Sequence, residues 1–267
     1  MNSSSKYAIL HLSDLHVEDF KSQGKGNEYR SRMCEQYYPD VLIKTLKNLK
    51  KSSKIEVKLI IISGDVANQS LPREYLKAKI FLEKLVEELE LKKEQILIIP
   101  GNHDINRNYL NDQYEELVIS NSELKPNTLQ KEKLSKYEKF YNEFYNNDGI
   151  IFDATKAICC EKYIKDLNLL ILGINSIYRE SFREEDHKGE INNEALRREL
   201  KEIDRKYSNC FKVAVFHHSP KVTWGHTEGI IQNWPVVRET FMDHNINVFF
   251  YGHTHECLRE KKRYKII

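Results

Sequence analysis

The chain has 267 residues, of which 40% are hydrophobic and 31% are charged, and 42 basic residues balance 40 acidic ones. This composition indicates a globular protein with one large core, and the small net charge provides no overall field toward nucleic acid. The first residues do not resemble an export signal, and no apolar stretch approaches the ~20 residues of a transmembrane helix. The five cysteines include the neighbours Cys159 and Cys160, a poor arrangement for disulfides. We therefore expect a cytoplasmic protein with reduced thiols and no membrane partner.

Six short, mainly apolar runs of five to seven residues predict β-strands. Because these runs do not alternate regularly with polar residues, we expect strands that are covered on both faces. The six runs span residues 7–12, 57–62, 95–99, 168–174, 212–216 and 246–251.

The stretches between the runs have the spacing of amphipathic helices. Apolar residues recur at helical intervals within residues 73–92, and shorter stripes of the same kind occupy residues 41–49 and 196–203. Strands that alternate with helices are typical of α/β proteins. The sequence therefore predicts an α/β sandwich with a largely parallel central sheet and helices on its faces.

Residues 106–148 interrupt this alternation. They contain seven aromatic residues among Lys, Glu and Asn, with a break at Pro126 and Asn127. We expect two helices inserted between strands. Two interpretations stay open: a cap whose aromatic side chains face the substrate, or a surface helical hairpin whose aromatic side chains form a local core.

Asp or His residues follow five of the six predicted strands. Functional groups gather at the carboxyl ends of strands in open α/β sheets, so five such clusters indicate one shared site. Isolated Asp and His residues usually lie on the polar surface. Five clusters of them, each at a strand end, are not expected unless they form one site. The residues are Asp14, His16, Asp65, Asn102, His103, Asp104, His217, His218, His253 and His255.

The types of these residues indicate a metal site. Carboxylate, amide and imidazole groups without thiolates suit divalent ions such as Mn, Fe, Zn or Ni. A carboxylate can bridge two ions, which fits Asp65, and two ions about 3.5–4 Å apart stabilise the attacking and leaving oxygens of phosphoryl hydrolysis. We therefore expect two divalent metal ions as cofactors, with manganese favoured.

In chain order, the motifs Asp-x-His, Gly-Asp, Gly-Asn-His-Asp, His-x-Pro and Gly-His-x-His resemble the signature of the calcineurin-like metallophosphoesterases, from about Leu10 to His255. The resemblance implies a binuclear phosphoesterase with the sandwich fold of that family. It implies that one ion is held by Asp14, His16, Asp65 and His255. It implies that the other ion is held by Asp65, Asn102, His218 and His253. His103 would be the acid, or the group that stabilises charge, beside the leaving group.

The preference for His218 over His217 rests on the family's spacing, in which the ligand stands two residues before a proline, here Pro220. His217 would then support the ligands or pack against the sheet. Because adjacent residues at a strand end point to opposite sides, a shift of one residue would exchange these roles. Asp104 is expected to orient Asn102, His103 or their loop, and Arg107 to meet a substrate phosphate or to pair with the cap.

Family members usually continue past the last motif into further strands, whereas twelve residues follow His255 here. Either the sheet closes differently, or the chain is a fragment of a longer protein, which we favour. We expect residues 1–267 to form one metallophosphoesterase domain that includes the insertion.

The resemblance implies hydrolysis of a phosphate ester and is closest to the branch with bacterial cyclic-nucleotide phosphodiesterases, so we favour a nucleotide-type diester as substrate. A phosphomonoesterase or phosphoprotein phosphatase has the same motifs, because the motifs build the metal centre and not the substrate pocket. A nuclease would need a basic track, and no dense pattern of Lys, Arg and aromatic residues flanks the motifs. A binding module that has lost the chemistry is the alternative outside enzymes, but such modules usually lack ligands.

Overall fold

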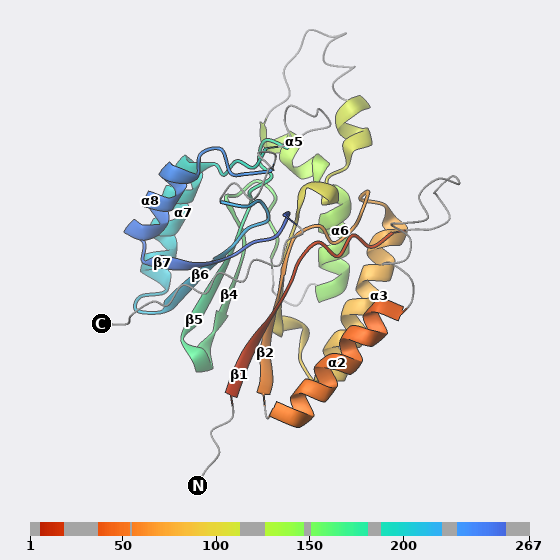
Figure 1. Ribbon diagram of the computed structural model, residues 1–267. Helices are drawn as coiled ribbons and strands as arrows, with labels where there is room; N and C mark the ends of the chain where they lie inside the picture. Colours follow the sequence, from red (N-terminus) through yellow and green to blue (C-terminus); the bar gives the residue numbers. More distant parts are fainter. Residues whose placement is uncertain are drawn as a thin grey trace.

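The computed structural model describes residues 6–18, 37–53, 55–112, 126–146, 151–180, 188–220 and 229–254. These residues form two β-sheets that pack against each other, with helices on the outer side of each sheet (Figure 1). The predicted α/β sandwich of largely parallel strands flanked by helices is confirmed.

The first sheet contains three parallel strands, in the order β1 (Lys6–Leu12), β2 (Ile55–Ser63) and β3 (Ile96–Ile99). Helices α2 (Tyr37–Ser53), α3 (Pro72–Leu89) and α6 (Ser135–Tyr145) lie on its outer side (Figure 1). The short 3₁₀ turns η2 (Lys93–Gln95) and η3 (Asn102–Asp104) come directly before and shortly after β3. Because the three strands are parallel, the loops that follow them leave the sheet at the same edge.

The second sheet contains four strands, in the order β4 (Ile158–Ile164), β5 (Leu169–Ile174), β6 (Phe211–Val215) and β7 (Ile246–Phe250). Strands β5, β6 and β7 are parallel, and β4 is antiparallel to β5, to which the 3₁₀ turn η4 (Lys165–Leu167) connects it. Helices α7 (Asn193–Lys206) and α8 (Trp234–Asp243) cover this sheet on the side opposite to α2 and α3 (Figure 1).

Strand β5 shows why its sequence is apolar at every position. Leu169 and Ile171 pack in the core that the two sheets share, whereas Leu170 and Leu172 pack in a second core with the residues of α7 and α8. Successive side chains of a strand point to opposite faces, so a strand covered on both faces needs apolar residues throughout.

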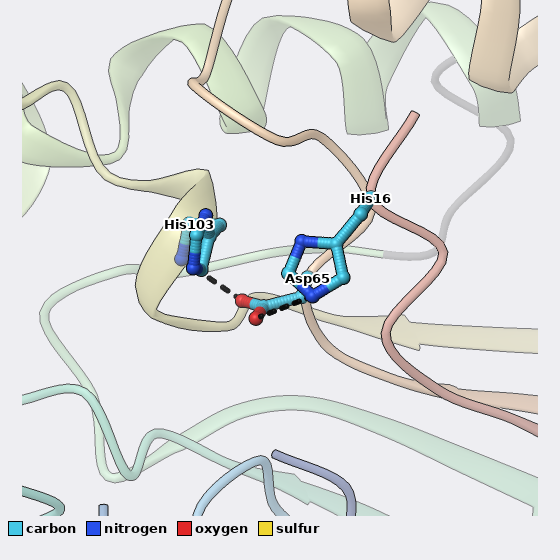
Figure 2. A group of neighbouring side chains, drawn as sticks. All are labelled: His16, Asp65 and His103. Atoms are coloured by element: carbon cyan, nitrogen blue, oxygen red, sulfur yellow. Dashed lines mark hydrogen bonds and ion pairs between the residues drawn. The ribbon is translucent and has the colours of Figure 1, made fainter. Parts of the chain in front are cut away.

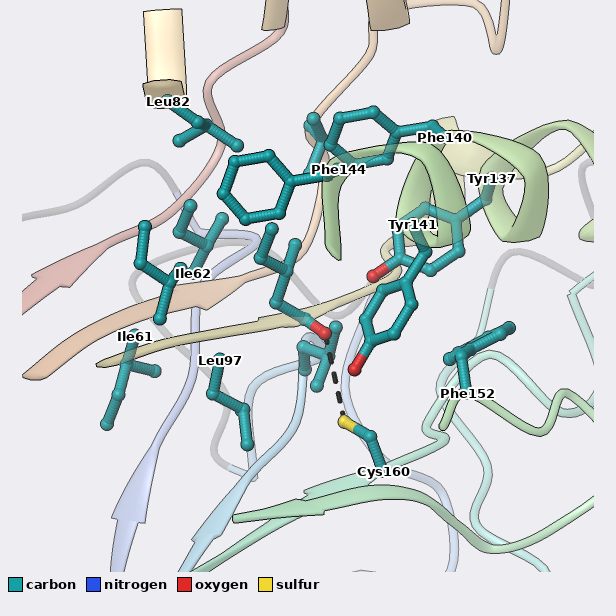
Figure 3. Close-up of a cluster of buried hydrophobic side chains, with 14 of the residues drawn as sticks. Ile61, Ile62, Leu82, Leu97, Tyr137, Phe140, Tyr141, Phe144, Phe152 and Cys160 are labelled. Carbon is teal, nitrogen blue, oxygen red and sulfur yellow. Dashed lines mark hydrogen bonds between the residues drawn. The ribbon is translucent and has the colours of Figure 1, made fainter. Parts of the chain in front are cut away.

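Helices α5 (Pro126–Lys133) and α6 are the described part of the predicted insertion. Figure 3 shows aromatic side chains of α6 packed among the apolar side chains of the first sheet. The hydroxyl of Tyr145 donates a hydrogen bond to the carbonyl of Ile96 at 2.9 Å. The aromatic side chains of α6 are therefore part of the core and do not face a substrate. Five of them are at most 3% exposed, namely Tyr137, Phe140, Tyr141, Phe144 and Tyr145.

Two elements are not predicted by the apolar runs or the helical stripes. Strand β4 contains the charged pair Glu161 and Lys162, which breaks its apolar pattern, and helix α8 is short and carries Pro235 in its first turn. Among the helices in the described ranges, none combines the length and the apolar character that spanning a bilayer requires.

Phe144→Ala should lower the free energy of unfolding by about 3–5 kcal/mol, because truncation of a buried aromatic side chain leaves a cavity in a close-packed core. Chemical denaturation measures the change. Leu76→Ala is the matched control, because Leu76 lies on the neighbouring helix α3 and is 58% exposed; it should change stability by about 0.5 kcal/mol or less. A Phe144→Ala protein of unchanged stability would contradict the assignment of α6 to the core.

Candidate metal centre

The loops after five strands meet at one edge of the two sheets. Four of the motif residues in these loops have left-handed backbone conformations: φ is 55° at Asp14, 43° at His16, 53° at Asp65 and 73° at His253. Residues other than glycine rarely adopt such conformations, which cost on the order of 1–3 kcal/mol each and cluster at functional sites. Backbone strain is therefore present at four of the residues that the sequence motifs single out.

Asp65 lies among the side chains of the motif residues that these loops carry, and its own side chain is 2% exposed. Its Oδ1 accepts a hydrogen bond from the backbone N–H of His103 at 2.9 Å, and its Oδ2 lies 3.6 Å from Nε2 of His16. Figure 2 shows His16 and His103 on either side of the carboxylate. Burial alone would raise the pKa of Asp65, but the adjacent His217 ring holds that pKa well below its usual range. Asp65 is therefore an anion.

Side chains from three other loops also converge near Asp65. Nε2 of His217 lies 2.8 Å from Oδ1 of Asn102 and 3.1 Å from Nδ1 of His253. Nδ1 of His253 lies 3.0 Å from the same Oδ1. The carboxylate of Asp14 accepts a hydrogen bond from the backbone N–H of His253, with distances of 3.0 and 3.1 Å to its two oxygens. The first loop of one sheet is thus joined directly to the last loop of the other.

The polar atoms that face Nε2 of His217 provide more lone pairs than protons. Nδ1 of His217 donates to the carbonyl oxygen of Ser63 at 2.9 Å, so in the neutral ring Nε2 carries only a lone pair. That lone pair faces Oδ1 of Asn102 and, at 3.4 Å, Oδ2 of Asp65. A positive charge among these atoms would offset their repulsion, and a proton can provide it. Burial alone would lower the pKa of His217, but the Asp65 carboxylate raises it to about 9.

A divalent metal ion fits the same arrangement. The described residues provide two groups of ligand atoms, and Asp65 belongs to both. Within each group, the ligand atoms lie within 4.8 Å of one another. Imidazole and carboxylate ligands without thiolates suit ions such as Mn²⁺ or Zn²⁺. Metal-bound histidines commonly donate their other ring N–H to a backbone carbonyl, as His217 does to Ser63. One group is His16, Asp65 and His103, and the other is Asp65, His217 and His253.

The structure places His217 and His218 the other way round from the expectation based on proline spacing. The ring of His217 lies in the cluster, whereas His218 points away, with Nδ1 3.0 Å from Oγ of Ser176 and Nε2 3.0 Å from Oε1 of Glu180. The register of β6 explains this. Val215 belongs to the core shared by the sheets, and side chains alternate, so His217 continues on that side and His218 on the other.

Burial and the neighbouring charged His217 ring lower the pKa of His218 to about 3. The same two causes, with His218 as a further neighbour, lower the pKa of His253 to about 3. Both rings are therefore neutral at physiological pH. Neutral imidazole is the form that binds metal ions, so His253 needs no proton loss before it can serve as a ligand.

His103 lies beside His16, with ring centroids 4.6 Å apart and the ring planes nearly perpendicular. Its Nδ1 contacts the carbonyl oxygen of Asn68 at 2.7 Å. Because a carbonyl oxygen only accepts hydrogen bonds, Nδ1 carries a proton. Nε2 is then the ring atom available for proton exchange, and the side chain is only half-buried. This placement is compatible with the acid role expected for His103, which stays a prediction.

Asp104 is fully buried behind the site. Its carboxylate accepts a hydrogen bond from the Tyr75 hydroxyl at 3.1 Å and from three backbone N–H groups at 2.9 to 3.1 Å. Asp104 therefore joins the loop after β2 to the loop after β3, and its expected orienting role stays a prediction. The three N–H groups belong to Val66, Ala67 and Gly101.

The remaining expected residues are placed as follows. Arg107 is half-buried, and its Nη2 donates to the backbone carbonyl of Asn102 at 3.5 Å. His255 lies outside the described residues. The sequence did not indicate the carbonyl groups of Ser63 and Asn68, because any residue type can provide a carbonyl.

The sequence matches the family of calcineurin-like phosphoesterases over residues 7–257, and the chain belongs to this family. It is 25% identical over 272 residues to the "Uncharacterized metallophosphoesterase-like protein YydB" of Bacillus subtilis (strain 168). That match covers 94% of this chain and 49% of the relative, so the chain spans about half the relative's length. Among solved structures it is similar to a dimetal phosphatase from Danio rerio, with a TM-score of 0.47, 12% identity, and coverage of 92% of this chain and 81% of that chain.

Binding of Mn²⁺ should release a proton from the metal-free protein. The pKa of His217 is raised to about 9, so its ring is protonated at neutral pH and the ion must displace that proton. The apparent affinity should therefore rise with pH until about pH 9 and then level off. Calorimetric titrations in buffers of different ionisation enthalpy count the protons released. An affinity that does not change between about pH 6 and pH 9 would contradict this reading of the cluster.

Proposed function

We propose that the chain is a binuclear metal-dependent hydrolase of phosphate esters that acts on a phosphodiester of the nucleotide type. The observation that carries the proposal is the place of Asp65 at the carboxyl ends of the strands, where its Oδ2 lies 3.6 Å from Nε2 of His16 and 3.4 Å from Nε2 of His217. When bound, two such ions lower the pKa of a water toward about 7 and neutralise charge that develops on the phosphoryl oxygens.

We assign the ligands as the motifs imply, with one change. His217 takes the place of His218, because its Nε2 faces Asn102 and Asp65 while both ring nitrogens of His218 are engaged elsewhere. Manganese is the proposed ion. The first ion is assigned to Asp14, His16, Asp65 and His255. The second ion is assigned to Asp65, Asn102, His217 and His253.

The residues of the chain position the ligands and handle the leaving group. The backbone N–H of His103 fixes Oδ1 of Asp65, so the motif after β3 orients the carboxylate that both groups share. The bond from Nδ1 to the carbonyl of Asn68 fixes the His103 ring and leaves Nε2 for the substrate. As the bond to phosphorus breaks, the departing oxygen gains negative charge, and His103 donates a proton to it or stabilises that charge.

The preference for a small diester is supported by the resemblance of the motifs to bacterial cyclic-nucleotide phosphodiesterases and by the charge of the chain. A nuclease that follows a long strand relies on many contacts from Lys and Arg to phosphates, and here the net charge is only +2. A catalytically silent module is disfavoured, because six of the seven assigned ligand residues, all except His255, lie together in the described residues. We also propose a cytoplasmic location, which the free thiols of Cys159, Cys160 and Cys210 support.

A substrate panel tests the proposal. The purified protein, loaded with Mn²⁺, is given a cyclic nucleotide, a linear dinucleotide, single-stranded DNA and a phosphomonoester, with Asp65→Ala as the inactive control. We expect turnover of a small diester and about two ions per chain, the content of a binuclear site. Turnover of the monoester alone would contradict the diester preference. Two bound ions without any turnover would support the silent module.

His217→Ala should weaken binding of one of the two ions by about 100-fold or more, whereas His218→Ala should keep two ions at saturating Mn²⁺. The reason is that Nε2 of His217 faces the cluster, while His218 contacts Ser176 and Glu180. Metal analysis after equilibrium dialysis measures the two contents. Loss of an ion from His218→Ala, with full content in His217→Ala, would reinstate the proline-based assignment.

His103→Ala should leave both ions bound but should slow the departure of a basic leaving group. General acid catalysis contributes roughly 10²–10⁴-fold, so kcat on a diester with a sugar-alkoxide leaving group should fall by about that factor. On a p-nitrophenyl diester the leaving group is already stable as an anion, and the loss should be much smaller. The ratio of the two losses is measured in one variant, which cancels general damage to the site. Equal losses on both substrates would show that His103 stabilises phosphoryl charge without donating a proton.

A further inference from the structure

Lys133, the last residue of α5, is 1% exposed, although lysine is rarely buried. Its Nζ donates to three backbone carbonyl oxygens, those of Ile177 at 2.7 Å, Tyr178 at 3.0 Å and Glu180 at 3.2 Å. An ammonium group has three donors, so all of them are used. Burial lowers the pKa of Lys133 to about 7, against the opposing effect of Glu180, which shows that placing this side chain here is costly.

The three carbonyl groups belong to one turn, residues 177–180, that follows β5. Gln130 also reaches this turn, with Nε2 donating to the carbonyl of Tyr178 at 2.8 Å. Residues 130 and 133 lie on the same face of a helix, so α5 holds the turn with two neighbouring side chains. Within the turn, the N–H of Glu180 donates to the carbonyl of Ile177 at 3.1 Å. The insertion and the turn thus form one hydrogen-bonded unit.

The turn carries Glu180, which begins a chain of hydrogen bonds into the metal centre. Oε1 of Glu180 lies 3.0 Å from Nε2 of His218, and Oγ of Ser176 lies 3.0 Å from Nδ1 of the same ring. That Oγ accepts hydrogen bonds from the backbone N–H groups of His217 and His218 at 3.1 and 3.2 Å. With both lone pairs occupied, the hydroxyl proton points to Nδ1. His218 therefore carries its proton on Nε2 and donates it to Glu180.

The ring of His218 packs against His253 with little free space. Their ring centroids are 4.8 Å apart. A Cβ atom at Gly189 would lie 2.6 Å from Cβ of His218, and a Cβ atom at Gly229 would lie 1.7 Å from Nε2 of His253. Because close-packed interiors transmit displacement, a shift of Glu180 would move both rings.

We propose that Lys133 is a positioning residue of the phosphoesterase site. By fixing the turn at residues 177–180, it holds Glu180 against His218 and so sets the position of His253 and the backbone of His217. Helix α5 of the insertion thus influences the site indirectly, through its contacts with the turn at residues 177–180. The proposal rests on the proposed function for its kinetic consequence, but its structural consequence can be measured without turnover.

The test compares Lys133→Met with Lys131→Met. Methionine keeps most of the lysine stem and removes the three donors, and Lys131 is an exposed residue of the same helix. The first readout is the ¹⁵N–¹H NMR spectrum of the histidine side chains, in which His218 should show a proton on Nε2. Lys133→Met should shift or broaden this signal, and Lys131→Met should leave it unchanged. The signal itself is assigned by its absence from His218→Ala.

The second readout is kinetic, with Mn²⁺ at saturation and bis(p-nitrophenyl) phosphate as substrate. Misplacement of a site by about 1 Å can cost on the order of 10²-fold, so kcat of Lys133→Met should fall about 10- to 100-fold while KM changes little. Lys131→Met should retain the wild-type kcat. If Lys133→Met lowers the melting temperature but leaves both the His218 signal and kcat unchanged, Lys133 only stabilises the fold and the proposal is overturned.

A second pair of variants tests the link from the turn to His218, on which the proposal depends, if Lys133→Met does not fold. Glu180→Gln keeps an oxygen that accepts the proton of His218, whereas Glu180→Leu removes it. The His218 signal and kcat should be lost in the leucine variant and largely retained in the glutamine variant. Equal behaviour of the two variants would overturn the proposal. If the wild-type protein hydrolyses no diester, the proposed function fails, and the NMR comparison still decides the role of Lys133.

Discussion

The lone pairs of Asp65, Asn102 and His217 converge, with Nε2 of His217 only 2.8 Å from Oδ1 of Asn102 and 3.4 Å from Oδ2 of Asp65. A positive charge among these atoms, whether a proton or a metal ion, stabilises such an arrangement. The surroundings prevent the groups from turning away. The carbonyl of Ser63 fixes His217, and the N–H of His103 fixes Asp65. The fold therefore keeps these lone pairs close together, in an arrangement that a bound cation stabilises.

Parallel strands are what bring this cluster together. The carboxyl ends of parallel strands lie at one edge, so short loops suffice to deliver a side chain from each strand to the same place. Each loop then turns sharply, which accounts for the left-handed backbone at Asp14, His16, Asp65 and His253. The loops also lie close to one another, because a Cβ atom at position 101 would lie only 2.2 Å from Oδ1 of Asp65.

The sequence was informative where the type of a residue is enough to indicate its structural role. Continuous apolar runs predicted the buried strands, and Asp, Asn and His after them predicted where the site would form. It was less informative where register decides. His217 and His218 are chemically identical, and only the side on which Val215 packs separates them. Lys133 could not be distinguished from its neighbour Lys131, because its burial depends on carbonyl groups more than 40 residues away in the chain.

The division of the site between two sheets links its geometry to the core. Asp65 follows a strand of the first sheet and His217 a strand of the second, so their 3.4 Å separation depends on how closely the sheets approach. At Gly173, where β5 lacks a side chain, the two sheets lie close together. A Cβ atom at Gly173 would lie 2.4 Å from Sγ of Cys160 and 2.7 Å from Cγ2 of Ile99 in the first sheet. A side chain there would push the sheets apart and separate the ligands, so the packing that stabilises the fold also sets the metal centre.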